Sequence, residues 1–317
     1  MVNNKTKVTF LFPGQGAQYP SMALDFLASS KTAATLFALA SEAMGRDIQA
    51  LLRDSDAEFL KRSDIAQPTV TLANLCVAAF LKDRYLRPVC VAGHSLGEYA
   101  ALVSSEVISP MDCLKLVVAR GKAMQETVEH IAGSTDSAPG MAAIIGLASD
   151  QVESLVSSSG IADLYVANIN SPGQVVVAGT AKALGRAEEI FKEAGARRVL
   201  RLQVAGPFHS PLMAEAADKF GPVLESTPFK DPAIPLFSNV SGKAVSSGTE
   251  ARELALKQIT SPVRWIAEEA AIAALDIEMA LETGPGKALQ GLWKDSGIKL
   301  PIFAAGKVED ITTLFEN

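Results

Sequence analysis

The order of apolar and polar positions along the chain predicts short buried strands and longer helices. The first apolar run, "VTFLF" at residues 8–12, is β-branched and aromatic and ends in "PGQG", which predicts a buried strand and a tight loop. A long helix is predicted over "QPTVTLANLCVAAFLKDRYL" at residues 67–86, with Pro68 near its start. The stretch "RPVCVAGHSLGEYAALVSS" at residues 87–105 has the order strand, turn, helix. This order predicts an α/β domain with a largely parallel sheet.

A second pattern begins after "AGSTDSAPG" at residues 132–140, a small, polar stretch typical of a linker. Strands are then predicted at "MAAIIGL", "LYVANIN", "QVVVAGT" and "RRVLRLQV", with helices at "SDQVESLVSSSG" and "AKALGRAEEIFKEAG". The series β-α-β-β-α-β is typical of a ferredoxin-like domain. We therefore predict a small ferredoxin-like domain at residues 133–204, inserted into a large α/β-hydrolase-like domain made of residues 1–132 and 205–317.

The α/β pattern returns after Gly206. Strands are predicted at "IPLFSNVSG", "IEMALETG" and "KLPIFAAG", and helices at "SPVRWIAEEAAIAAL" and "GKALQGLWKDS". An inserted domain leaves a cleft between two units, and such clefts are frequent ligand sites.

Composition excludes several classes of protein. With 317 residues, 48% hydrophobic and 20% charged, the chain can bury a large core, and its net charge of −6 argues against general nucleic-acid binding. The N-terminal apolar run is too short for a secretory signal, and no apolar stretch approaches the roughly 20 residues that span a bilayer. We expect a soluble protein that does not associate with a membrane. Cys76, Cys90 and Cys113 lie in apolar surroundings without metal-ligand spacing, which predicts reduced core cysteines, a cytoplasmic location and no metal site.

The clearest chemical motif is Gly93-His94-Ser95-Leu96-Gly97, which fits G-x-S-x-G. Small flanking residues allow a strained strand-to-helix turn that exposes the serine hydroxyl, and the Leu96 amide would then face an oxyanion. Alternatively, Ser95 only caps the helix through its hydroxyl. Local sequence favours the nucleophile without excluding the cap.

A serine nucleophile needs a base, and histidine is the usual one near neutral pH. The side chain of His94 should point away from Ser95, and His130 lies in a charged, solvated helical stretch. By elimination His209, in "VAGPFHSPLM", is the favoured base; the alternative is a loop histidine packed on Phe208. No acid between Ser95 and His209 is marked by a motif, so a backbone carbonyl could orient the histidine instead.

Two basic features have open interpretations. Arg120, in "KLVVARGKAM", could pair with an internal acid or hold a ligand carboxylate by two parallel hydrogen bonds. The segment from Lys182 to Arg201 carries six basic and three acidic residues. This excess of positive charge is either a solvated helix face or a docking site for an acidic partner.

Seven segments together resemble the malonyl-CoA:acyl carrier protein transacylases and the related acyltransferase domains of polyketide synthases. They occur in the family's order and cover almost the whole chain: "FPGQGAQ", "GHSLGEY", "ARGKAM", "NINSPGQVVVAG", "GPFHSPLM", "QITSPVRW" and "ETGPGKAL".

The resemblance implies a ping-pong transfer without a cofactor. Ser95 would take the malonyl group from malonyl-CoA, and the phosphopantetheine thiol of acyl carrier protein would remove it, with His209 as general base and acid. The family steadies this histidine with a backbone carbonyl, here that of Gln258. The amides of Gln15 and Leu96 would form the oxyanion hole, and Arg120 would bind the malonyl carboxylate. The resemblance also implies that Asn168 and Asn170 line the path of the thioester or pantetheine.

Selectivity and alternatives follow from the same resemblance. Relatives that take methylmalonyl tend to have glutamine after the nucleophile and serine before the histidine, whereas this chain has Leu96 and Phe208, which both fit malonyl. The alternatives are a free-standing acyltransferase of a polyketide pathway, a serine thioesterase and a non-enzymatic scaffold that binds carrier protein. No dimer motif is present, so we expect a monomer.

Overall fold

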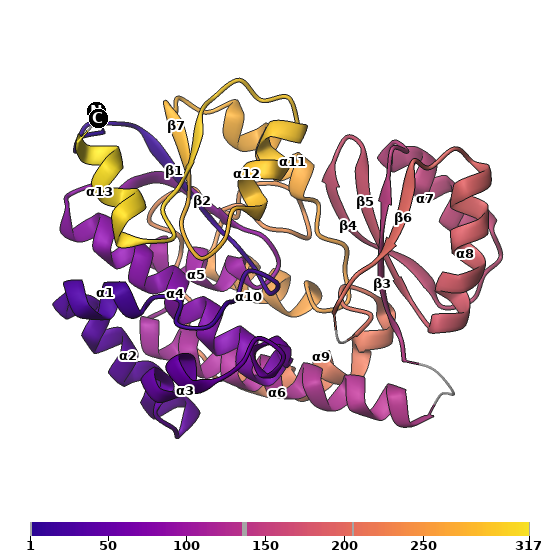
Figure 1. The fold of residues 1–317 in the computed structure, drawn as a ribbon, viewed down its shortest axis with the longest axis horizontal. Helices are drawn as coiled ribbons and strands as arrows, with labels where there is room; N and C mark the ends of the chain where they lie inside the picture. Colours follow the sequence, from indigo (N-terminus) through magenta and orange to yellow (C-terminus); the bar gives the residue numbers. More distant parts are fainter. Residues whose placement is uncertain (1, 135–137, 205, 317) are drawn as a thin grey trace.

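A parallel sheet of four strands lies in the larger of two α/β units (Figure 1). The computed structural model describes residues 2–134, 138–204 and 206–316. The strand order is β2-β1-β7-β8, with β1 paired in parallel to both β2 and β7. Every residue of β1 is buried, as expected of a parallel strand covered on both faces. The bounds are β1 Val8–Phe12, β2 Pro88–Gly93, β7 Met279–Glu282 and β8 Ile302–Ala304.

Helices surround this sheet, and the two ends of the described chain lie side by side (Figure 1). The α-helices of the unit are α1 Leu24–Ser29, α2 Lys31–Met44, α3 Ile48–Asp54, α4 Ser63–Asp83, α5 Gly97–Ser104, α6 Pro110–Ser134, α9 Ala214–Glu225, α10 Gly248–Lys257, α11 Trp265–Ala273, α12 Ala288–Asp295 and α13 Val308–Glu316. Short 3₁₀ helices span Phe59–Lys61 and Pro211–Met213.

Helix α4 begins earlier than its sequence pattern predicts. It starts at Ser63, so Pro68 lies inside the helix rather than near its start. In the described part of the chain, α4 is also the one helix long and apolar enough to cross a membrane, yet 89% of its most apolar window is buried inside the protein. It packs against α2, α5 and α6, which identifies it as a core helix.

The smaller unit is an antiparallel sheet covered by two helices. The strand order is β4-β5-β3-β6, and its elements follow the β-α-β-β-α-β series predicted for a ferredoxin-like domain. The bounds are β3 Gly140–Ile145, α7 Ser149–Ser158, β4 Leu164–Ser171, β5 Gln174–Gly179, α8 Ala181–Glu193 and β6 Arg198–Arg201. The α/β fold class is thus confirmed, while the boundaries of the two domains stay a prediction.

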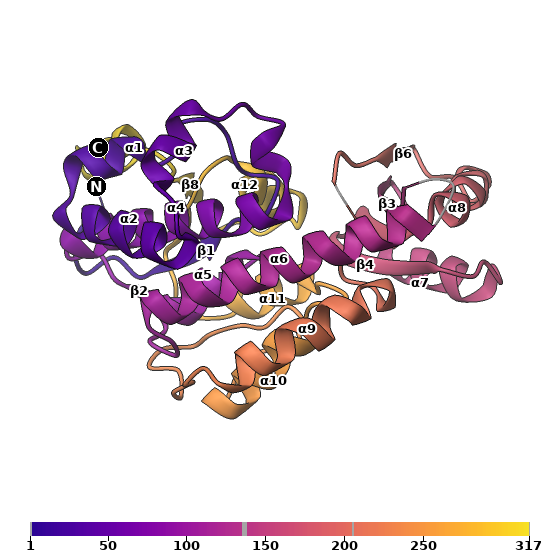
Figure 2. The same ribbon diagram turned by 90° about the horizontal axis from the view of Figure 1, so that it is seen from below.

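Helix α6 and a backbone pairing at Val263 both link the two units. Helix α6 runs from the large unit to the small one with α9 beside it (Figure 2). The linker predicted over residues 132–140 is wrong at its start, because α6 continues through Ser134; residues 135–137 lie outside the described part. In addition, Val263 pairs with β4: its N–H donates to Ala167 and its carbonyl accepts from Ile169, across 2.9 and 2.8 Å.

The strand predicted at residues 234–242 does not form. Only two isolated bridges remain there, Leu236 with Val91 and Phe237 with Ala244. The backbone of Asn239 is used elsewhere: its N–H donates to the side chain of Glu98, and its carbonyl accepts from Arg264. The segment therefore adds a single residue pair beside β2, at Leu236 and Val91, and does not continue as a strand.

Candidate active site

Ser95 lies on a sharp turn between β2 and α5. Its backbone has φ of 52°, a left-handed conformation that is unfavourable for a residue with a Cβ. A Cβ on Gly93 would come within 2.0 Å of the Gly97 backbone, and one on Gly97 within 2.0 Å of the Phe12 carbonyl oxygen. Both glycines are therefore required by the close approach of backbone segments around the serine.

The hydroxyl of Ser95 contacts His209 rather than capping α5. Oγ of Ser95 lies 2.6 Å from Nε2 of His209, and α5 has no side-chain cap. His209 is buried and also has a left-handed backbone, with φ of 57°. The alternative in which Ser95 is only a helix cap is therefore wrong.

The other ring nitrogen of His209 contacts the backbone. Nδ1 donates to the carbonyl oxygen of Gln258 across 2.8 Å, which leaves Nε2 as the proton acceptor. Burial, followed by the nearby Arg120 charge, lowers the pKa of His209 to about 3. The imidazole is thus neutral at physiological pH and able to accept the serine proton.

The two remaining histidines lie elsewhere. Nε2 of His94 lies 2.9 Å from Oδ1 of Asn170, and its ring packs edge-on against Trp265, so it points away from Ser95 as predicted. His130 is exposed on α6 and contacts Glu215 at 2.7 Å.

Arg120 projects from α6 into the buried interior. Nη1 donates to Oε1 of Gln67 across 2.9 Å and Nη2 to Oε1 of Gln258 across 3.0 Å, while Nε has no partner. Within the described ranges Arg120 forms no ion pair with a carboxylate, so the internal-acid alternative finds no partner. Burial lowers the pKa of Arg120, but a guanidinium stays charged in proteins. A buried guanidinium that forms no ion pair and whose Nε has no partner is suited to bind an anion.

The loop after β1 lies against the serine turn. A Cβ on Gly14 would come within 2.5 Å of the His94 carbonyl oxygen and 3.5 Å of the Leu96 nitrogen. Across the described residues, neither the N–H of Gln15 nor that of Leu96 donates a hydrogen bond within the protein. Two free amides thus lie on adjacent backbone segments beside Ser95.

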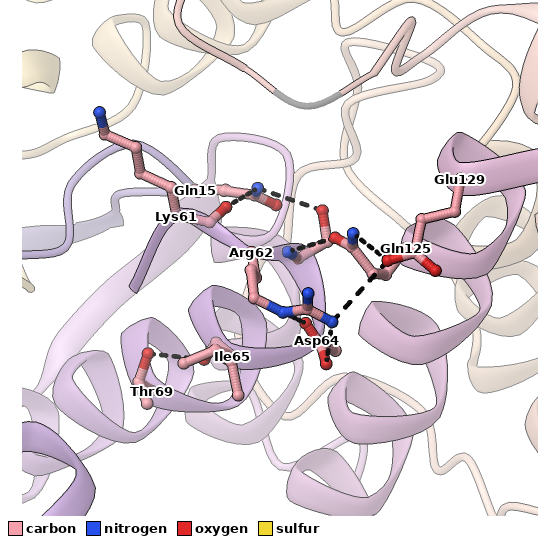
Figure 3. A network of polar contacts seen from close by, with 9 residues as sticks. Gln15, Lys61, Arg62, Asp64, Ile65, Thr69, Gln125 and Glu129 are labelled. Carbon is pink, nitrogen blue, oxygen red and sulfur yellow. Dashed lines mark hydrogen bonds and ion pairs between the residues drawn. The ribbon is translucent and has the colours of Figure 1, made fainter. Parts of the chain in front are cut away.

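The side chain of Gln15 anchors this loop to α4 and α6 (Figure 3). Its Nε2 donates to the hydroxyl of Ser63 across 3.3 Å and to the carbonyl of Lys61 across 3.4 Å. The N–H of Ser63 donates to Gln125, which in turn donates to Glu129. The position of the Gln15 backbone is therefore tied to the helix that carries Arg120.

The chain matches a family of known proteins along most of its length. A model of the acyl transferase domain family matches residues 9–295. The malonyl CoA-acyl carrier protein transacylase of Bacillus subtilis is 37% identical over 309 residues, which cover 96% of this chain and 95% of the relative. That of Escherichia coli K12 is 39% identical over 291 residues, covering 91% and 92%. The protein belongs to the malonyl CoA-acyl carrier protein transacylase family.

Solved structures of family members share its fold. The transacylase of Coxiella burnetii superposes with a TM-score of 0.92 at 30% identity, covering 100% of this chain and 99% of that one. A malonyl-transacylase solved in complex with its type II polyketide synthase acyl-carrier protein gives a TM-score of 0.91 at 35% identity, covering 98% and 100%.

Of the remaining predicted site residues, Asn170 lines a cavity between the two units, whereas Asn168 and Phe208 do not. A cavity of about 400 Å³ is lined by Gln15 and His94 of the large unit, Asn170 and Gln174 of the small one, and α12. Asn168 lies two residues before Asn170 on β4 and is buried. Within the described ranges its side chain forms no hydrogen bond. Phe208, also buried, precedes His209.

Several site residues were missed by the sequence analysis. Gln67 holds Arg120, and Asn239 accepts the N–H of Ser95 across 2.7 Å. Two buried carboxyls complete the group: burial raises the pKa of Glu98 to about 7 and raises that of Glu268 well above its usual range. Glu98 could have been found from the sequence, because it directly follows the G-x-S-x-G motif. No local pattern marks Gln67, Asn239 or Glu268.

The structure also places the three cysteines and the basic segment from Lys182 to Arg201. Cys76, Cys90 and Cys113 are free thiols buried in the core, as predicted. The described part of the chain holds no cluster of three or more histidine, cysteine or acidic side chains arranged for a metal ion. The six basic side chains between Lys182 and Arg201 are all exposed on α8, β6 and the turn between them.

Proposed function

We propose that the protein transfers a malonyl group from malonyl-CoA to the phosphopantetheine thiol of acyl carrier protein through an acyl-enzyme on Ser95. The observation that carries the proposal is the 2.6 Å contact between Oγ of Ser95 and Nε2 of His209, close to a buried and unpaired Arg120. Family membership supports the same donor and acceptor, because its relatives are malonyl CoA-acyl carrier protein transacylases.

Acylation begins with proton transfer from Ser95 to His209. Nε2 takes the hydroxyl proton while Oγ attacks the thioester carbonyl carbon and forms the C–O bond. The oxyanion that develops is met by the N–H groups of Gln15 and Leu96, which are free of partners among the described residues. The C–S bond then breaks, and His209 returns its proton to the leaving CoA thiolate.

Arg120 selects the acyl group in this proposal. Its free N–H groups would bind the malonyl carboxylate, which offers two oxygens to the planar guanidinium. An acetyl or longer unbranched acyl group lacks this charge and would leave Arg120 buried without a counter-ion. We further propose that Phe208 excludes an α-methyl substituent and that Asn168 and Asn170 lie along the thioester path.

The second half of the reaction is the reverse chemistry with a different thiol. His209 deprotonates the phosphopantetheine thiol, whose sulfur attacks the malonyl-Ser95 ester and releases the serine. The carrier protein needs a docking surface, and we propose the basic surface formed by β6 and the turn before it. Arg197, Arg198 and Arg201 are exposed there, and within the described ranges none of them is in an ion pair.

The location and assembly of the protein follow from the same features. Three free cysteines suit a reducing compartment, so we propose a cytoplasmic enzyme. We also propose that it acts as a monomer, since one chain supplies every residue of the site.

A serine thioesterase would form the same acyl-enzyme but release it to water. Partition of the malonyl group between carrier protein and water separates the two activities. We expect malonyl-carrier protein as the main product, with no transfer by Ser95→Ala. Predominant hydrolysis in the presence of carrier protein would support the thioesterase, and full activity of Ser95→Ala would exclude Ser95 as the nucleophile.

A further inference from the structure

Two side chains from distant parts of the chain hold the backbone of Ser95. Oδ1 of Asn239 accepts the Ser95 N–H across 2.7 Å, and Nε2 of Gln258 donates to the Ser95 carbonyl oxygen across 3.0 Å. A left-handed conformation at a non-glycine residue persists only where its surroundings fix it. These two hydrogen bonds therefore fix the turn that presents the serine hydroxyl.

Asn239 is itself held rigidly. It is fully buried, and its Nδ2 donates to the carbonyl oxygen of Gly93 across 2.7 Å and to Oε1 of Glu268 across 2.8 Å. Its backbone N–H donates to Oε2 of Glu98 across 3.0 Å. The amide thus bridges the residue that ends β2 and the serine two positions later, and it cannot rotate without leaving buried polar groups unpaired.

We propose that Asn239 is a positioning residue for acylation: it keeps the hydroxyl of Ser95 within proton-transfer distance of His209 by accepting the Ser95 N–H. The inference rests on the proposed function, because it requires Ser95 to be the nucleophile. It also explains why the segment 234–242 pairs with β2 only at Leu236, since the backbone and side chain of Asn239 are hydrogen-bonded to Glu98 and Ser95 instead.

The role predicts a specific kinetic defect. Asn239→Leu has a similar volume but no acceptor, so Ser95 loses its positioning bond and Nε2 of Gln258 loses a 3.2 Å contact with Oδ1. Gln258 keeps its bonds to the Ser95 carbonyl, to Glu98 and to Arg120, so the malonyl-binding contacts of Arg120 remain. A displacement of about 1 Å can cost 10²-fold in rate. We expect the rate of Ser95 acylation by saturating malonyl-CoA to fall about 100-fold, with the KM for malonyl-CoA unchanged.

Controls separate positioning from general destabilisation. Asn239→Ala tests the same loss if the leucine variant does not fold. Ile272→Ala removes buried apolar contacts on α11 without touching the serine turn; it should lower the melting temperature but leave the acylation rate unchanged.

The experiment is rapid-quench acylation of each variant with malonyl-CoA, paired with labelling by a small fluorophosphonate that carries no carboxylate. We expect Asn239→Leu and Asn239→Ala to slow both reactions equally, because the defect is at Ser95. Wild-type acylation rates in both variants, or slowing of the malonyl reaction alone, would overturn the proposal. A wild-type protein that reacts with the fluorophosphonate but not with malonyl-CoA would instead contradict the proposed function.

Discussion

Nδ1 of His209 lies 2.8 Å from the backbone carbonyl oxygen of Gln258, the position at which many serine hydrolases place a carboxylate. A carbonyl fixes the ring and its tautomer but does not offer the negative charge that stabilises an imidazolium. The positive charge of Arg120 nearby opposes protonation further. The arrangement therefore favours a neutral base in the free enzyme, and binding of an anionic acyl group beside Arg120 would make protonation easier.

This relationship predicts different pH limits for the free enzyme and its substrate complex. The pKa of about 3 for His209 belongs to the free enzyme, so kcat/KM should not fall as pH decreases from 7 to 5. A malonyl carboxylate offsets the Arg120 charge and raises the pKa of His209, so the acid limb of kcat should lie at higher pH than that of kcat/KM. Stopped-flow pH profiles test this, and an acid limb of kcat/KM near pH 6.5, the ordinary pKa of histidine, would contradict it.

Arg120 should determine donor selectivity. Truncating one partner of a buried charge pair costs about 2–5 kcal/mol, so Arg120→Ala should lower kcat/KM for malonyl-CoA by at least about 30-fold. Transfer from acetyl-CoA should be retained or increased, because the acetyl group needs no counter-ion. Arg120→Lys keeps the charge without the planar fork and should fall between the two. Equal losses with malonyl-CoA and acetyl-CoA would show that the arginine is structural.

Buried Glu269 should make the protein less stable as pH rises. Its Oε1 accepts from the indole of Trp265 across 2.7 Å, and burial raises its pKa from 4.5 to about 8. Between these two values the folded state holds a proton that the unfolded state has lost, so stability decreases toward pH 8 by up to about 1.4 kcal/mol per pH unit.

Substitution of Glu269 should flatten this dependence. Both buried histidines, His94 and His209, have lowered pKa values, so they affect stability mainly below pH 6.5, and the test is best made above it. Urea unfolding between pH 6.6 and 8 should give a smaller decrease for Glu269→Gln than for the wild type. Exposed Glu253→Gln is the matched control, and it should behave as wild type. Parallel curves for Glu269→Gln and wild type would contradict the assignment.

The basic surface of β6 predicts a salt-dependent effect on one half-reaction. Reversal of Arg197 and Arg198 to glutamate should raise the KM for acyl carrier protein about tenfold at low salt and less at high salt. Acylation by malonyl-CoA should be unaffected. Reversal of the exposed Lys31 and Lys243 gives the same change in net charge away from this surface and should leave both reactions unchanged. An unaltered KM for carrier protein in the arginine variant would exclude this docking surface.

Local sequence predicted those features that local sterics determine. The serine turn was visible because a Cβ on Gly93 or Gly97 would come within 2.0 Å of backbone atoms, so both positions must be glycine and the spacing appears in the sequence. The ferredoxin-like series was visible because each element has its own apolar period and turn.

Contacts between residues that are far apart in the chain could not be predicted from the sequence pattern. Asn239 contacts Ser95 from 144 positions away and Gln258 contacts Ser95 from 163, and neither lies in a pattern that a strand or helix period reveals. The strand predicted at residues 234–242 failed for the same reason: its apolar run is suited to a strand, but the backbone of Asn239 pairs with Glu98 and Arg264. The Leu96 amide was expected from the G-x-S-x-G turn, whereas the carbonyl of Gln258 and the amide of Gln15 were expected only through the resemblance to the family, since backbone groups carry no residue signature.

The most direct test of the central claim is the intact mass of the protein after brief exposure to malonyl-CoA without carrier protein. The account predicts a single malonyl adduct on Ser95 that disappears when holo acyl carrier protein is added and is absent from Ser95→Ala. No adduct in the wild type, or an adduct that persists in Ser95→Ala, would contradict it.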